Sequence, residues 1–297
     1  MPVTSPSGPP YPASSGPPYP SSPPLGPDGY PPYPPTALEP QPGPPGAVPP
    51  WWRPPDPRRW GLGDVGYGLL VAFGGQMVIG VVLALAGAVD TDDGLELPAW
   101  GILLSVAAGW LGFIGWPVLA SYVKGQRSLA RDFGLLFRPV DVGWGILGGA
   151  VVLGLTVALN VFWYVVSGDN APDNAGFLPD SPSVVAAVGL FLAVAVVTPF
   201  AEELFFRGLL LRALEKRFNT NIAVVVSAMV FGSLHIAGVT SASSLGELAL
   251  HGIFIGVVIT GYGVVFAVLT VYTGRLWPAI VAHMVINGVG VVGYLAT

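Results

Sequence analysis

The chain has 297 residues, of which 52% are hydrophobic and only 10% are charged. A soluble globular domain has about 25% charged residues, so this composition indicates an integral membrane protein. The formal net charge of -5 argues against a nucleic-acid partner, and the absence of cysteine excludes disulfides, thiolate metal sites and a cysteine nucleophile.

The first sixty residues differ in composition from the rest of the chain. They hold most of its 32 prolines, and the sequence Pro-Pro-Tyr-Pro begins at Pro9, Pro17 and Pro31. Such a segment cannot bury an apolar core. We therefore expect residues 1–60 to form a disordered, partly polyproline II tail that tethers a membrane domain, residues 61–297. The alternative for this tail is a docking site for a proline-binding module.

Seven apolar runs of bilayer length follow the tail. A helix needs about 20 residues to cross the hydrocarbon layer, so we expect an all-α, polytopic bundle of about seven transmembrane helices. The fourth run has no clear stop before Lys216, and its helix should continue or break near Pro199 and resume. The glycine-rich stretch 143–149 suits close helix packing in lipid. The expected spans are 64–88, 98–122, 142–167, 184–204, 221–239, 247–273 and 276–296.

The charges between these runs predict the orientation in the membrane. If the tail is cytoplasmic, all 12 basic residues fall on the cytoplasmic side, although Arg207 is submerged. The opposite side receives only acids. By the positive-inside rule, the N-terminus is cytoplasmic and the C-terminus lies outside, and we expect a bacterial plasma membrane. The acids on the outer side are Asp90, Asp92, Asp93, Glu96, Asp169, Asp173, Asp180 and Glu247.

Three charged residues end the fourth apolar run: Glu202, Glu203 and Arg207. Each costs about 2.5 to 3.5 kcal/mol at the centre of a bilayer, so we expect the protein to use them. Glu203 and Arg207 are four positions apart, and an ion pair between them would let both charges persist at low dielectric. Glu202 points about 100° away from Glu203 and can face a cavity as a general base acting on water.

Other polar side chains fall at a similar depth on later helices. Counting the helical rise from the cytoplasmic ends puts Glu202 and His235 roughly 21 Å deep, His283 roughly 12 Å and Asn287 roughly 18 Å. His283 and Asn287 are four apart, so together they could donate hydrogen bonds to an oxyanion. His235 is the other proton-handling group in this layer. His251 is expected at the outer surface and is left out of the site.

A base, a second proton-handling group and oxyanion donors suit peptide-bond hydrolysis without a covalent intermediate. The competing interpretation is a structural ion pair with packing histidines. Glu202, His235 and His283 could also supply a three-ligand zinc site with an open fourth position. The His-Glu-x-x-His helix of common zinc proteases is absent, and we favour a mechanism without metal.

Three ordered motifs resemble those of the CAAX prenyl endopeptidase and bacteriocin-processing (CPBP or Abi) family of intramembrane proteases. The resemblance covers residues 184–297. The substrate stays open, because eukaryotic members cleave a prenylated C-terminal tripeptide, whereas many bacterial members are tied to bacteriocin immunity. The motifs are Glu202-Glu203-x-x-x-Arg207, Phe231-x-x-x-His235 and His283-x-x-x-Asn287.

The resemblance implies a role for each of these polar residues. Glu202 would activate water with His235 as its partner, and His283 with Asn287 would stabilise the oxyanion. Glu203 and Arg207 would help to hold the site together. The substrate would be a membrane-associated protein or peptide.

Two other classes of function use the same residues. A proton-coupled transporter would employ the buried carboxylates, arginine and histidines as a relay, and would often show internal repeats, which the sequence lacks. A membrane scaffold or immunity protein of the same fold would act without catalysis, by binding a partner through the tail.

Overall fold

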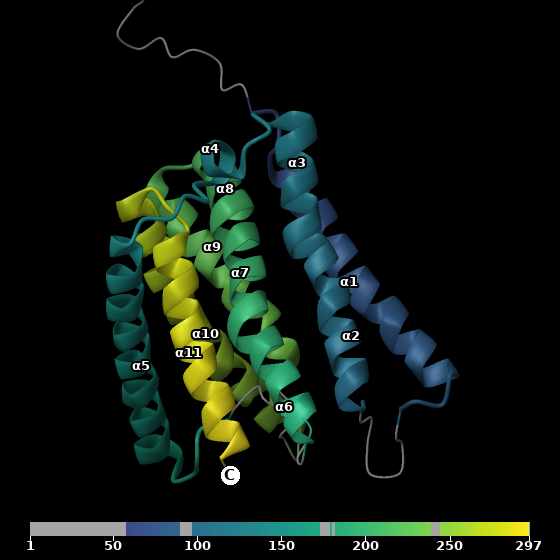
Figure 1. Cartoon of the computed structure of the whole chain (residues 1–297). Coiled ribbons are helices and arrows are strands. Elements are labelled where there is room, and N and C mark those ends of the chain that lie inside the picture. Colours follow the sequence, from purple (N-terminus) through teal and green to yellow (C-terminus); the bar gives the residue numbers. More distant parts are fainter. Residues whose placement is uncertain (1–57, 90–96, 173–178, 180–181, 239–243, 297) are drawn as a thin grey trace, which may run out of the picture. The chain divides into compact units, whose positions relative to one another are not determined.

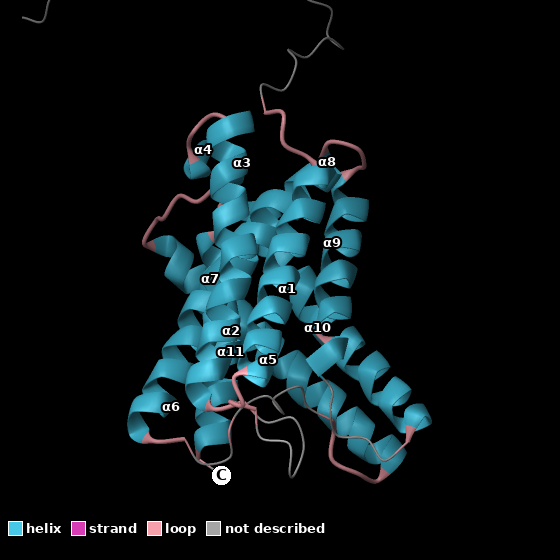
Figure 2. Cartoon of the chain, turned by 90° about the vertical axis from the view of Figure 1, so that its right-hand side faces the viewer, coloured by secondary structure: helices cyan, strands magenta, loops and turns pink. Residues whose placement is uncertain are grey.

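The computed structural model describes residues 58–89, 97–172, 179, 182–238 and 244–296. They belong to one compact unit, Asp56–Thr297, and every regular element within them is helical (Figure 2). The predicted tail lies outside the described residues except for positions 58–60, so its disorder stays a prediction.

Among the described residues, six helices are long and apolar enough to cross a membrane, which confirms the all-α membrane fold. Four of these spans are uninterrupted α-helices, and the other two contain π-helical turns. The uninterrupted spans are α1 (Leu62–Leu85), α5 (Val140–Ser167), α10 (Leu245–Thr273) and α11 (Trp277–Leu295). The second span, Ala99–Lys124, consists of α2 (Ala99–Trp110), the π-helix η1 (Leu111–Gly115) and α3 (Trp116–Lys124).

The fourth span, Val184–Glu215, is also a composite helix. It runs on past Pro199, which is the first of the two outcomes expected from its apolar run. Its parts are α6 (Val184–Phe191), the π-helix η2 (Leu192–Val197), α7 (Thr198–Glu203), the π-helix η3 (Leu204–Leu210) and α8 (Leu211–Glu215). The short α4 (Leu129–Phe133) precedes α5.

The fifth expected helix is shorter than predicted. Instead of residues 221–239, α9 spans Thr220–Leu234 and has 15 residues, followed by one 3-10 turn, η4 (Ile236–Gly238). At 1.5 Å per residue α9 is about 22 Å long, less than the roughly 30 Å of hydrocarbon. Its C-terminal residue is followed directly by His235.

Both prolines inside the composite helices follow a π-helical turn. Pro117 comes just after η1 and Pro199 just after η2. Proline lacks an N–H and its ring clashes with the carbonyl four residues earlier, and the wider π-turn accommodates both defects. At η2 the N–H of Thr198 bonds to the carbonyl of Ala193. Because Pro199 has no N–H to offer, the carbonyl of Val194 is open to a side-chain donor.

Glycines set the closest helix contacts. On α5, Gly145, Gly148 and Gly149 face Val281, Ala282 and Val285 of α11, as the stretch 143–149 predicted. On α9, Gly232 lies against the backbone of α10, where an added Cβ would be 2.5 Å from the Gly256 carbonyl oxygen and 2.8 Å from the Thr260 nitrogen. In Figure 1, α5 lies on one side of the central helices and α1–α3 lie on the other.

The ends of the bundle differ in charge. The end with α3, α4 and α8, opposite the C-terminus in Figure 1, holds most of the described basic residues. Several are tied into place there: Lys124 Nζ lies 2.7 Å from Asp64 Oδ1, Arg275 Nη2 lies 2.5 Å from Asp141 Oδ1, and Lys216 Nζ donates to the Trp60 carbonyl at 2.7 Å. Which side of a membrane this end faces stays a prediction.

Candidate active site

The charged residues of the fourth span lie inside the protein. Glu203 ends α7 and Arg207 lies in η3, and both side chains are 0% exposed. Arg207 Nη1 lies 3.0 Å from Glu203 Oε1, and Nη2 donates to the Gly263 carbonyl at 3.1 Å. The guanidinium also sits 4.3 Å from the centroid of the Phe231 ring, a cation–π contact. The spacing of four therefore does produce a buried ion pair.

His283 of α11 joins this pair to Glu202. Its Nδ1 lies 2.9 Å from Glu203 Oε1, and its Nε2 lies 3.7 Å from Glu202 Oε2. The imidazole is stacked on the Phe266 ring, with centroids 4.8 Å apart and an interplanar angle of 20°. Residues from the fourth span and from α11, 80 positions apart, thus form one line of contacts from Arg207 to Glu202.

Glu202 differs from Glu203 in its surroundings. Its side chain is 13% exposed, whereas that of Glu203 is fully buried. Of the two carboxylates, Glu202 is the one that is partly exposed at the protein surface, in keeping with the expectation that adjacent helical positions face different directions.

His235 reaches the cluster through an aromatic ring. It caps the C-terminus of α9, and its Nδ1 lies 2.8 Å from the Phe231 carbonyl oxygen. Its ring lies 4.7 Å from the Phe231 ring, and the Phe231 ring lies 5.7 Å from the ring of His283. Among the described residues, no hydrogen bond or ion pair joins His235 to Glu202. The structure therefore brings His235 close to the cluster without the direct pairing with Glu202.

Asn287, one turn after His283, is bound to the open carbonyl at the π-turn. Its Nδ2 donates to the Val194 carbonyl at 3.0 Å. A carbonyl only accepts hydrogen bonds, so the amide must turn its nitrogen to Val194. His283 and Asn287 thus each have a partner on the fourth span, and they share no partner among the described residues.

The three residues considered as zinc ligands, Glu202, His235 and His283, each have protein neighbours in this structure. Both nitrogens of His283 face carboxylates, and Nδ1 of His235 is bound to a backbone carbonyl. Within the described part of the chain, no group of three or more His, Asp or Glu side chains is arranged to hold a metal ion.

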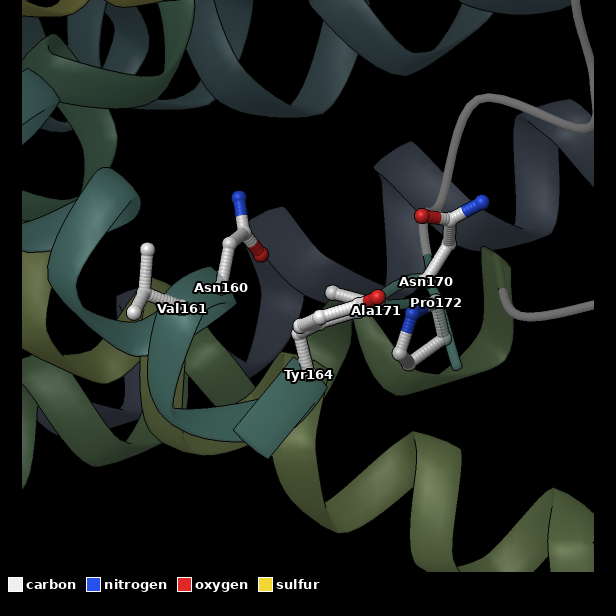
Figure 3. A pocket seen from close by; sticks show the side chains of 6 residues that line it. All are labelled: Asn160, Val161, Tyr164, Asn170, Ala171 and Pro172. Carbon is white, nitrogen blue, oxygen red and sulfur yellow. The ribbon is translucent and has the colours of Figure 1, made fainter. Parts of the chain in front are cut away.

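A hollow of about 420 Å³ lies elsewhere, at the C-terminal end of α5 (Figure 3). It contains none of the predicted site residues. The hollow is lined by Asn160, Val161, Tyr164, Asn170, Ala171 and Pro172.

His251, which was expected at the outer surface, lies on α10 beside Trp163 of α5, with their rings 5.7 Å apart.

Three parts of the cluster were not foreseen from the sequence. Phe266 and the Gly263 carbonyl come from α10, which bears none of the recognised motifs. A free backbone carbonyl, such as that of Val194, cannot be recognised from residue types. The signal for it in the sequence was Pro199, which has no N–H to donate to that carbonyl.

The fold and this cluster define an integral, multi-pass membrane protein with a buried glutamate–histidine–arginine site. Residues 184–289 match the family model of type II CAAX prenyl endopeptidase Rce1-like proteins. This match confirms the resemblance drawn from the three motifs, all of which lie within residues 184–289.

One curated relative supports the same classification. It is "Putative membrane peptidase YdiL" of Bacillus subtilis (strain 168), 29% identical over 150 residues. The match covers 50% of this chain and 54% of the relative, so about half the length of each protein is compared. No solved structure matches the chain.

Proposed function

We propose that the chain is an intramembrane endopeptidase that hydrolyses a peptide bond of a membrane-associated protein or peptide. The observation that carries the proposal is the line of contacts from Glu202 through His283 to Glu203 and Arg207 inside a membrane domain. The Rce1-like match includes all of these residues, and the relative's name describes a membrane peptidase, so both support the proposal.

Glu202 is the general base in the proposed reaction. It takes a proton from a water molecule, whose oxygen attacks the carbonyl carbon of the scissile bond while the C=O electron pair moves onto the carbonyl oxygen. When the intermediate collapses, the C–N bond breaks and Glu202 returns the proton to the leaving nitrogen. The reaction needs no side-chain nucleophile and forms no covalent intermediate.

His235 is the proposed partner of Glu202 in holding the water. The Phe231 carbonyl can only accept, so Nδ1 of His235 carries the hydrogen of that bond. In the neutral ring Nε2 is then an acceptor, which suits a bond from the second hydrogen of the attacking water.

His283 and Asn287 are the proposed oxyanion donors. Asn287 Nδ2 has two hydrogens, and the bond to Val194 uses one of them. The other is left for the substrate oxygen. Because the bond to Val194 fixes the amide in advance, the donor needs little reorganisation when charge develops on the oxygen.

The setting of the enzyme is part of the proposal. We place the tail and the basic end of the bundle in the cytoplasm of a bacterial cell, with the C-terminus outside the plasma membrane. A proline-binding module is the partner that the Pro-Pro-Tyr-Pro repeats would fit. The transporter and scaffold alternatives gain no specific observation from the described residues.

The test removes the base and its partner one at a time. Glu202→Ala and His235→Ala should each abolish proteolysis while the protein still expresses and inserts, because the buried Glu203–Arg207 pair is intact in both. The measurement is labelling of new N-termini in membranes that contain the wild type or a variant, which requires no knowledge of the substrate.

His251→Ala is the matched control, since it removes a histidine outside the cluster. It should leave the labelled N-termini unchanged. If Glu202→Ala and His235→Ala both kept the full set of cleavages, the protease proposal would be wrong and a scaffold would become the leading function.

A further inference from the structure

Thr198 is the first residue of α7, the short helix that carries Glu202 and Glu203. Its Oγ1 accepts a hydrogen bond from Trp110 Nε1 of α2 at 3.1 Å. A hydroxyl also has one hydrogen to donate, and among the described residues that hydrogen has no acceptor. Because Trp110 occupies one side of the oxygen, the hydrogen of Thr198 must point away from the indole.

This unused hydrogen distinguishes Thr198 from other hydroxyls of the membrane helices. Inside a helix, threonine and serine can donate to the carbonyl four residues earlier. The corresponding carbonyl for Thr198 belongs to Val194, and it accepts from Asn287 Nδ2 instead. Three hydroxyls of this chain do bond to their own helix in this way, at 2.7 to 2.8 Å: Thr156, Ser167 and Thr273.

Thr198 lies between Asn287 and Glu202 along the fourth span. Val194, Thr198 and Glu202 follow one another at intervals of four positions, so they lie about one turn apart on one side of the helix. All three are partly exposed, whereas Glu203 is buried. A helix carbonyl points toward the residue four positions later, so the amide of Asn287 that binds the Val194 carbonyl lies at the level of Thr198.

A carboxylate, a hydroxyl and an amide therefore line the same side of the fourth span. We propose, on the basis of the proposed function, that Thr198 is a substrate-binding residue that donates its hydroxyl hydrogen to the carbonyl oxygen of the scissile bond. Asn287 reaches that oxygen from α11 and Thr198 reaches it from the fourth span. As negative charge develops on the oxygen, both bonds become stronger, and neither donor gives up its proton.

Trp110 is a positioning residue in this arrangement. It touches neither the substrate nor the attacking water. By donating to Thr198 Oγ1 it fixes the oxygen and leaves the hydrogen aimed at the substrate. A donor that is oriented before the reaction needs little reorganisation when charge develops.

Thr198→Val is the first test, because it removes the hydroxyl and keeps a β-branched side chain of similar shape. It should lower kcat by about 100-fold with KM nearly unchanged, since the lost bond gains its strength in the transition state. Thr198→Ser restores the hydroxyl and should bring kcat back close to the wild-type value. A peptide that contains a cleavage site found by N-terminal labelling supplies the substrate for these measurements.

Two results would overturn the role of Thr198. One is a Thr198→Val enzyme as fast as the wild type. The other is a Thr198→Ser enzyme as slow as Thr198→Val, which would mean that the shape of the side chain matters and its hydroxyl does not.

Trp110→Phe tests the positioning role. It removes the indole N–H and keeps an aromatic ring, so the Thr198 hydroxyl can rotate and kcat should fall, but by less than in Thr198→Val. In the Thr198→Val background the same substitution should have no further effect, because no hydroxyl remains to be oriented. An equal loss in both backgrounds would show that Trp110 does not act through Thr198.

The indole signal of Trp110 reports on the bond independently of activity. In ¹H–¹⁵N spectra of the protein in lipid nanodiscs, Trp110→Phe identifies this signal by its loss. The proton signal should move upfield in Thr198→Val and stay near its wild-type position in Thr198→Ser. Signals of buried indoles without a hydrogen-bond partner give the reference position, and an unchanged Trp110 signal in Thr198→Val would overturn the positioning role. These reference indoles are Trp60, Trp116 and Trp163.

Thr156→Val is the matched control. Thr156 is another threonine inside a membrane helix, and it bonds to the Val152 carbonyl and to Tyr262, neither of which belongs to the candidate site. Its kcat should equal that of the wild type. A loss as large as that of Thr198→Val would mean that any missing hydroxyl within the membrane slows the enzyme, and the specific role of Thr198 would be rejected.

Glu202→Ala separates this proposal from the proposed function. If Glu202→Ala leaves all cleavages of the wild type unchanged, the protease proposal fails and this role of Thr198 fails with it. If Glu202→Ala abolishes cleavage while Thr198→Val cleaves at the wild-type rate, the role of Thr198 alone is rejected.

Discussion

At the residue scale, the side chains of the candidate site are constrained by partners that the residue types alone do not reveal. Glu203 is shared by Arg207 and His283, and Asn287 is bound to a backbone carbonyl. The spacing of Glu203 and Arg207 made their ion pair predictable, because positions four apart are neighbours on the same face of an α-helix. The bond between Glu203 and His283 was not predictable, since 80 positions of chain and the packing of α11 decide it.

The ion pair leads to a prediction for stability. Arg207→Ala leaves Glu203 as a buried carboxylate without its cation, which should cost about 3 to 5 kcal/mol and lower the yield of folded protein. Thermal unfolding of the purified protein in detergent measures this loss. Arg217→Ala, at the exposed end of the same segment, should change stability by no more than about 0.5 kcal/mol. An Arg207→Ala variant as stable as the wild type would show that the pair contributes little.

The elements show where hydropathy is informative and where it is not. Five spans were located within a few residues, because about 20 consecutive apolar residues have few alternatives to a membrane helix. The fourth was located at its start, Val184, but its helix continues to Glu215 instead of ending at residue 204. The early end of α9 was missed, since the letters after Leu234 stay mostly apolar through Gly238. Pro199 raised the expectation of a break, but a π-turn before it lets the helix continue and opens the Val194 carbonyl to Asn287.

The close approach of α9 to α10 leads to a prediction for stability and activity. Gly232→Ala places a methyl group against the backbone of α10, where neither Gly256 nor Thr260 can move aside as a side chain would. We expect a loss of about 1 to 3 kcal/mol, together with lower activity, because His235 follows only three residues later. Both are measured by thermal unfolding and by the N-terminal labelling assay.

Gly154→Ala is the control for this substitution. Gly154 lies within α5 and has no atom within 4 Å of an added Cβ. Alanine in a helix interior is favoured over glycine by roughly 0.5 to 1 kcal/mol, so this variant should be as stable as the wild type or slightly more so. If both variants behaved alike, the close approach at Gly232 would not matter for stability.

At the scale of the whole molecule, charge divides the bundle into two ends. The described basic residues other than Arg207 gather where α3, α4 and α8 lie. Segregation of this kind follows from the sequence because loops alternate between the two sides of a membrane. The absolute orientation does not follow from the fold, since a helix bundle packs equally well in either direction.

The absence of cysteine makes the orientation easy to test. Single-cysteine variants Asp169→Cys and Arg131→Cys place a thiol at exposed positions on opposite ends of the bundle. With the N-terminus in the cytoplasm, an impermeant maleimide added to intact cells should label Asp169→Cys, and it should label Arg131→Cys only after lysis. The reverse pattern would invert the proposed topology.

The shortness of α9 has a consequence for the supply of water to the candidate site. Because α9 is shorter than the hydrocarbon layer is thick, we expect its last turn to end inside that layer. The carbonyls of a helix terminus find no donors in the lipid there, and each of them needs a hydrogen bond. His235 satisfies the Phe231 carbonyl, and we expect water to serve others nearby. Hydrolysis consumes one water molecule per bond cleaved, so a helix too short to cross the membrane would keep the site hydrated from within.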